Sequence, residues 1–96
     1  MDNYFFSDEE FIKKERDKAR KLRSSQWWKR KRSSGICHYC KNMIPIKELT
    51  MDHVIPLSKG GKSQKINLVP CCKDCNTKKN QLLPFEWEEY MNSLKQ

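Results

Sequence analysis

The sequence predicts a small α+β domain that gains part of its stability from a bound metal ion. Of its 96 residues, 36% are hydrophobic and 33% are charged, so the apolar core must be small. Two strand-like segments lie between two Cys-x-x-Cys pairs, and helical segments lie outside them. A domain of this size is marginal on burial alone and often needs a metal or disulfide staple.

Helices are predicted for the N-terminal third of the chain. Ser7 and Glu10 form a capping-box pattern, and no helix breaker follows before about residue 23. The apolar face of this helix is thin, so the helix either packs weakly on the body or binds a partner. A short second helix is predicted over residues 26–32, anchored by its two tryptophans.

Two strands are predicted in the middle of the chain. Apolar and polar side chains alternate over residues 48–55, and Pro56 ends this strand because proline lacks the ladder N–H. A loop with a Gly-Gly tip leads to a second strand over residues 66–69, which Pro70 closes.

Two more helices are predicted at the C-terminal end. One runs from about residue 73 to residue 80, and the other has Pro84 in its first turn. Side chains at i, i+3, i+4 and i+7 give this last helix a core-facing stripe of Trp87, Tyr90, Met91 and Leu94.

Positive charge is concentrated near the N-terminus. The net charge is +8, and eleven of the twenty residues in 13–32 are lysine or arginine. Such a dense cluster favours a nucleic-acid partner over a merely solvated helix face. We expect residues 1–34 to form a basic helical extension and residues 35–96 to form the compact domain.

Four of the five cysteines form two pairs with zinc-knuckle spacing, Cys37 with Cys40 and Cys72 with Cys75. Two such pairs supply the thiolates of a tetrahedral structural zinc site, which is closed and therefore not catalytic. Redox pairs, an iron–sulfur cluster and plain buried thiols are the alternatives. Because Cys72 repeats the spacing of the first pair, Cys71 is interpreted as a small buried side chain.

The cysteine count and the apolar runs bear on location. An odd number of cysteines without a signal peptide favours a reducing, cytoplasmic compartment. No apolar run approaches the roughly 18–20 residues of a membrane span, so no membrane partner is expected.

The central stretch carries a pattern of chemically active residues. The run DHVIPLSKGG begins with Asp52 and His53, NLVP begins with Asn67, and Asn76 directly follows the second cysteine pair. This order and spacing resembles the HNH endonucleases, in the zinc-stapled branch whose third signature residue is asparagine. The resemblance covers about residues 35–80. It implies a ββα-metal (His-Me finger) fold, a divalent cation and hydrolysis of DNA phosphodiester bonds.

The resemblance also implies roles for single residues. His53 is the general base that activates water, which suits an imidazole because its pKa lies near neutrality. Asp52 and Asn76 hold one Mg²⁺ or Mn²⁺, ions that prefer oxygen ligands. Asn67 braces the loop between the strands. The expected reaction is nicking of low sequence specificity that leaves a 5′-phosphate and a 3′-hydroxyl.

DNA contacts are expected from basic side chains beside the site and in the basic extension. The candidates, for which plain solvation is the alternative, are Lys59, Lys62, Lys78, Lys79, Arg30 and Arg32. Trp27, Trp28 and Tyr39 either stack on bases or fill the core, and core packing is favoured.

Two other functions stay open at this stage. One is a non-catalytic zinc module that binds nucleic acid through its basic helices, which would not need the set of Asp52, His53 and Asn76. The other is an accessory nuclease in a larger assembly for phage packaging or restriction, acting in the bacterial cytoplasm. The sequence leaves the oligomeric state undetermined.

Overall fold

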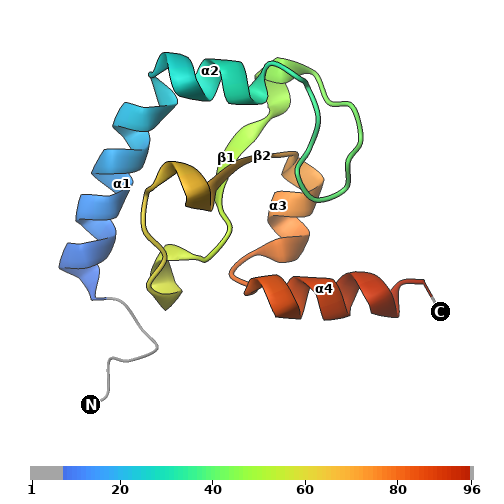
Figure 1. Cartoon of the computed structure of the whole chain (residues 1–96). Coiled ribbons are helices and arrows are strands. Elements are labelled where there is room, and N and C mark those ends of the chain that lie inside the picture. The colour runs from blue at the N-terminus through green and yellow to red at the C-terminus, as the bar shows by residue number, and fades with distance from the viewer. Residues whose placement is uncertain (1–7, 96) are drawn as a thin grey trace.

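The computed structural model describes residues 8–95 and has the predicted α+β fold. Two antiparallel strands lie between a helical N-terminal segment and a helical C-terminal segment (Figure 1). The elements in chain order are α1 (Glu9–Arg23), α2 (Gln26–Arg32), β1 (Thr50–His53), β2 (Leu68–Cys71), α3 (Lys73–Lys79) and α4 (Pro84–Ser93). Within residues 8–95, no helix combines the length and the apolar character that a membrane crossing requires.

The two N-terminal helices meet at a corner and are each capped by a polar side chain (Figure 1). Asp8 Oδ1 accepts from the Phe11 N–H at 2.8 Å, whereas Ser7, the predicted cap, lies outside the described residues. Ser25 Oγ accepts from the Trp28 N–H at 3.3 Å at the start of α2. Trp28 is buried, so it anchors α2 to the body as predicted.

The sheet pairs β1 with β2 in an antiparallel register that places Asp52 opposite Val69 and His53 opposite Leu68. β1 is shorter than predicted at both ends, because a 3₁₀ turn occupies residues 46–48 before it and the chain bends at residues 54–55 after it. β2 starts two residues later than predicted and continues through Pro70 to Cys71.

The prediction that Pro70 closes the second strand is therefore wrong. The Pro70 carbonyl accepts from the His38 N–H at 2.9 Å, so it points away from β1. The proline nitrogen faces the same side, away from β1, so the ladder between the two strands loses no N–H donor there.

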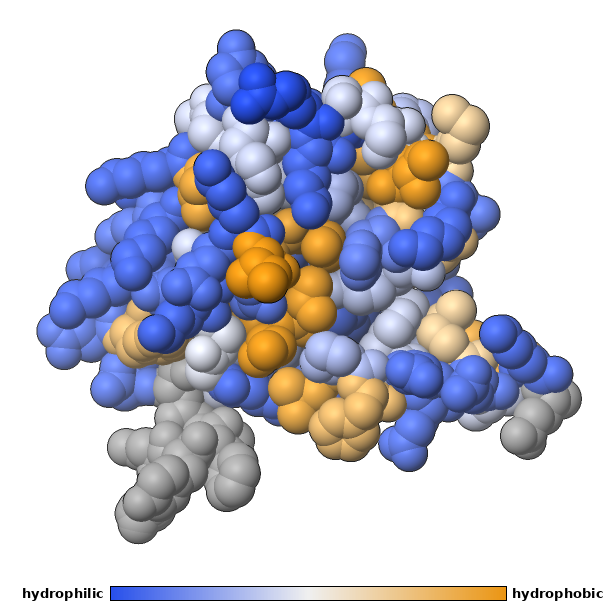
Figure 2. Space-filling model, viewed as in Figure 1, coloured by the Kyte–Doolittle hydropathy of each residue, from blue (hydrophilic) through white to orange (hydrophobic). Residues whose placement is uncertain are grey.

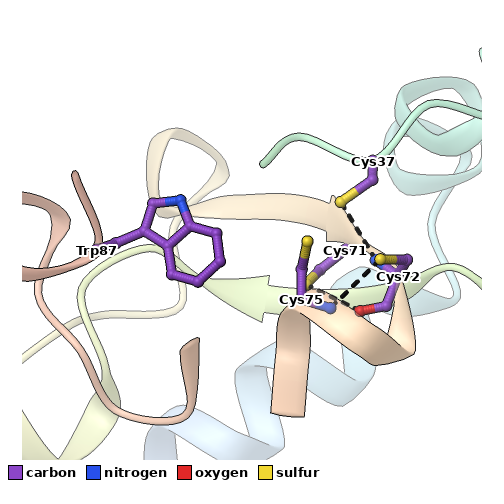
Figure 3. Close-up of a cluster of buried hydrophobic side chains, with 5 residues drawn as sticks. All are labelled: Cys37, Cys71, Cys72, Cys75 and Trp87. Carbon is purple, nitrogen blue, oxygen red and sulfur yellow. Dashed lines mark hydrogen bonds between the residues drawn. The ribbon is translucent and has the colours of Figure 1, made fainter. Parts of the chain in front are cut away.

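The core lies where α3 and α4 meet the end of the sheet (Figure 3). Tyr90 and Met91 of α4 pack against it, but Leu94 lies past the helix end and is 57% exposed, so the predicted stripe is wrong at its last position. The buried core residues of this cluster are Cys37, Cys71, Cys72, Cys75 and Trp87.

One face of the molecule combines a hydrophilic surface over α1 with a neighbouring apolar patch (Figure 2). Ile55 and Ile66 are exposed and line a shallow groove together with Pro84.

Candidate metal centre and active site

Four cysteine sulfurs converge at one end of the sheet. The Sγ atoms of Cys37, Cys40, Cys72 and Cys75 all lie within 4.8 Å of one another, and those of Cys40 and Cys72 are 4.0 Å apart. Four thiolates around one zinc ion, at a Zn–S distance of about 2.3 Å, would stand about 3.8 Å apart. The cluster therefore fits the closed, all-sulfur metal site that the spacing predicts.

Backbone N–H groups point at these sulfurs. The N–H of Cys72 donates to Cys37 Sγ and that of Cys75 donates to Cys72 Sγ, both at 3.4 Å. Burial opposes ionisation of Cys37, but backbone hydrogen bonds outweigh it and lower the pKa of this thiol to about 7. A thiolate is the form that binds metal, so the backbone prepares Cys37 for that role.

Cys71 stands outside the cluster, as predicted. Its buried thiol donates to the Cys72 carbonyl at 3.3 Å, and burial raises its pKa. Cys72 instead occupies the N-cap of α3, one helical turn before Cys75. The second cysteine pair thus fixes the start of α3.

The first cysteine pair also holds Asp52. Tyr39, which lies between Cys37 and Cys40, donates its hydroxyl to Asp52 Oδ2 at 2.5 Å. Burial and the adjacent carboxylate raise the pKa of Tyr39 far above its usual range, so the phenol keeps the proton that it donates. No sequence pattern assigns this role to Tyr39, and its place between two metal ligands is the one signal that indicates it.

Lys79 lies against Asp52 from the end of α3. Its side chain is completely buried, and its Nζ lies 3.3 Å from Asp52 Oδ2 and donates to the Val54 carbonyl at 3.2 Å. The ammonium also lies 5.4 Å from the centre of the Tyr39 ring. Lys79 therefore differs from the other five basic candidates, because its charge compensates a buried carboxylate and does not face solvent.

A cleft opens beside Asp52 and His53. Ile12 and Arg16 of α1 form one wall, and the segment after α3 contributes Asn80 to the other. The lining contains both polar and apolar side chains. Its two titratable residues from β1 are the neighbours Asp52 and His53. Asp52 and His53 therefore line the same cleft.

His53 is half-buried at this cleft, and its Nε2 lies 2.8 Å from Ser63 Oγ. Burial lowers the pKa of His53, and it outweighs the opposing effects of the Asp52 and Glu15 carboxylates. The imidazole is therefore neutral at pH 7, the form that can accept a proton.

Asn67 sits at the centre of the loop between β1 and β2. Its Oδ1 accepts from the Ile55 N–H at 2.8 Å, and its Nδ2 donates to the carbonyls of Ile55 and Lys62 at 3.1 and 2.9 Å. A Cβ on Gly61 would stand 1.7 Å from the Ile55 carbonyl oxygen, so only glycine fits there. Asn67 makes the contacts expected of a loop brace, and the brace lies just beyond His53.

Asn76 lies on α3, one turn before Asn80, and its side chain is exposed. It does not line the cleft beside Asp52, whereas Asn80 does. The structure therefore places Asn76 on the element that carries Lys79 to Asp52, without bringing its amide into the cleft wall.

The remaining basic candidates differ in their exposure and in whether they form an ion pair. Arg30 and Lys62 are exposed, and Arg32 is half-buried. Lys59 pairs with Glu86 at 3.3 Å, and Lys78 pairs with Asp74 at 3.1 Å. Arg30 and Lys62 are thus the exposed members of the set that form no ion pair within residues 8–95.

The fold and this site define a class: a small α+β domain in which a closed four-cysteine centre stands beside an open cleft with an Asp-His pair. A family model described as HNH endonuclease matches residues 37–89, more than half of the chain. The chain belongs to the HNH endonuclease family. No curated protein sequence matches it.

Proposed function

We propose that the protein is a divalent-metal-dependent endonuclease that hydrolyses DNA phosphodiester bonds. The observation that carries the proposal is the pairing of Asp52 with a neutral His53 at one cleft, in a chain of the HNH family. Phosphodiester hydrolysis needs a base for the attacking water and positive charge at the phosphate. The cleft offers a candidate for each need.

His53 is the proposed base. It takes a proton from water as the water oxygen bonds to phosphorus. The bond from phosphorus to the 3′ oxygen breaks, and that oxygen is protonated from solvent. The products are a 5′-phosphate and a 3′-hydroxyl, and one site per chain makes a nick.

Asp52 is the proposed ligand of Mg²⁺ or Mn²⁺ at the cleft, and Asn76 is proposed as a second ligand from the HNH pattern, because its amide does not line the cleft. The hydrogen bond and the ion pair that Asp52 makes within residues 8–95 both fall on Oδ2, so Oδ1 stays available to a cation. A carboxylate and an amide oxygen suit these hard ions. The bound cation would stabilise the negative charge that develops on the phosphate and on the leaving oxygen.

Zinc is the proposed ion of the cysteine centre, with a structural role. Four sulfurs leave no open position for a substrate, and thiolates favour zinc over magnesium. The centre fixes the position of Tyr39 and of the start of α3. Tyr39 donates a hydrogen bond to Asp52, and α3 carries the Lys79 side chain that pairs with Asp52.

DNA backbone contacts are proposed for the basic extension and for the loop beside the cleft. Arg16 lines the cleft with Asp52 and His53 and forms no ion pair within residues 8–95, so its guanidinium is free for a phosphate. Arg30, Arg32 and Lys62 would extend the contact with little sequence dependence.

Supercoiled plasmid is the test substrate. The zinc-loaded protein should convert it to the nicked form when Mg²⁺ or Mn²⁺ is added, and EDTA in excess of the added ion should stop the reaction. His53→Ala and Asn76→Ala should each remove most of the activity. Binding of plasmid without any nicking would overturn the proposal in favour of a non-catalytic zinc module.

A further inference from the structure

A chain of hydrogen bonds joins α1 to the back of His53. The Ser63 N–H donates to Glu15 Oε1 at 2.6 Å, and the Ser63 hydroxyl donates to the Glu15 backbone carbonyl at 2.5 Å. His53 Nε2 lies 2.8 Å from the same Ser63 Oγ. Glu15 and Ser63 are 4% and 5% exposed, so water cannot substitute freely for either partner.

The donor and acceptor roles in this chain are determined. A serine hydroxyl has one proton, and the Glu15 carbonyl can only accept, so the Ser63 proton points at Glu15. Ser63 Oγ must then accept from His53, and Nε2 of the imidazole must carry the hydrogen. In a neutral ring this leaves the lone pair on Nδ1.

We infer that Ser63 and Glu15 are positioning residues, which hold His53 in the Nε2–H tautomer and present Nδ1 to the attacking water. This inference rests on the proposed function. The proton of the water passes to Nδ1 as the water oxygen bonds to phosphorus, and Nε2–H keeps its bond to Ser63. The basic N-terminal helix is therefore part of the active site as well as a DNA-binding surface.

The role of Glu15 explains why a carboxylate is buried on a helix otherwise rich in lysine and arginine. Hydrogen bonding to the Ser63 N–H is the largest effect on Glu15, and it lowers the pKa of this carboxyl against the opposing effect of burial. Lys18 adds an ion pair at 3.1 Å from the exposed side. If α1 were to separate from the loop, the Ser63 hydroxyl would be free to rotate and donate to His53, which would reverse the tautomer.

The test reads the tautomer directly. Long-range ¹H–¹⁵N correlation spectra of ¹⁵N-histidine-labelled protein at about pH 8 distinguish the two neutral forms, and His38→Asn leaves His53 as the one histidine. Wild-type His53 should be Nε2–H. Ser63→Ala should give a mixture of tautomers and lower the kcat of plasmid nicking roughly tenfold at unchanged KM for DNA.

Matched variants separate positioning from general damage. Ser63→Thr keeps the hydroxyl and should give the wild-type tautomer and kcat. Glu15→Ala keeps the backbone carbonyl that accepts from the Ser63 hydroxyl but removes the acceptor of the Ser63 N–H, so it should change the tautomer and kcat in the same direction as Ser63→Ala and by less. Ser93→Ala removes an exposed serine hydroxyl at the end of α4 and should change neither. An Nδ1–H ring in the wild type, or a Ser63→Ala variant with an unchanged tautomer and kcat, would overturn the inference.

The proposed function and this inference fail in different ways. A wild-type protein that does not nick DNA would overturn the proposed function, while its spectrum would still decide the orientation of His53. An active wild type with the wrong tautomer would overturn the inference alone.

Discussion

The cysteine centre and the Asp52–His53 cleft stand at the two ends of α3, yet they are built in opposite ways. The centre takes its four sulfurs from two short pairs, and three of the four cysteines are buried. The cleft takes the partners of Asp52 and His53 from separate segments that include Tyr39, Ser63 and Lys79. A closed centre suits stability, and an open cleft suits chemistry. The two regions should therefore respond differently to substitution and to metal removal.

The largest expected effect is loss of a centre ligand. Structural zinc contributes about 10–16 kcal/mol of folding free energy in small domains, so Cys75→Ser should abolish the cooperative thermal transition. Circular dichroism and bound-zinc content measure this. Cys71→Ala is the matched control, because Cys71 is equally buried but outside the cluster. It should retain one zinc per chain, and equal zinc loss in both variants would contradict the proposed ligand set.

The next effect concerns the cleft alone. His53→Ala should lower plasmid nicking by about 10²–10⁴-fold, because it removes the proposed base, while the melting curve and zinc content stay near wild type. His38→Ala is the control, since the side chain of His38 is exposed outside that cleft. Full activity of His53→Ala would show that another group activates water.

A smaller effect is expected where the two regions touch. Tyr39→Phe removes the hydrogen bond to Asp52 and should lower the free energy of unfolding by about 1.5–3 kcal/mol, the range for bonds to charged groups. Tyr90→Phe is the control, since Tyr90 packs on Trp87 and its hydroxyl makes no hydrogen bond within residues 8–95. Chemical denaturation measures the free energy of unfolding of both variants. An unchanged value for Tyr39→Phe would show that the cysteine centre does not stabilise the cleft through this hydrogen bond.

A pH effect is expected from Glu15. Its pKa is lowered in the folded protein, so its stabilising contribution is present above its unfolded pKa of about 4.3 and is lost as the pH falls through the folded pKa. The stability difference between wild type and Glu15→Gln should therefore shrink as the pH is lowered from about 6 to about 3. Thermal melts across that range check this, and a difference that does not vary with pH would contradict it.

The smallest effect is expected at the surface. Arg30→Ala should weaken DNA binding slightly for every sequence and reduce the salt dependence of log K by about 0.9, the loss of one phosphate contact. Lys47→Ala, at an equally exposed lysine outside the basic extension, should leave the slope unchanged. Fluorescence titrations at several salt concentrations give the slope of log K against log salt for each protein. A wild-type slope in Arg30→Ala would show that Arg30 of α2 does not contact DNA.

The same contrast explains how much of the fold was predictable. Helices were placed well because their signals are local, as with Pro84 at the start of α4 and the tryptophans of α2. The strands were misplaced because their limits depend on pairing with a distant partner. Pro70 is the example, since only the position of β1 shows that the proline nitrogen faces away from the ladder.

The site follows the same rule. The cysteine cluster was predicted in full, because spacing alone specifies it. The bond between Ser63 and Glu15 joins residues 48 positions apart and depends on how α1 docks, so no local pattern reveals it. The burial of Lys79 was predictable in part, since it lies four residues after the buried Cys75 and therefore on the same face of α3.

The most direct test of the account compares two metals on one protein. Zinc-loaded wild type without added Mg²⁺ or Mn²⁺ should be fully folded and should leave supercoiled plasmid intact, and either ion should start nicking without changing the fold. Circular dichroism and a plasmid gel, run on the same samples, record both. Nicking by the zinc-loaded protein alone, undiminished in His53→Ala, would contradict the division between a structural centre and a catalytic cleft.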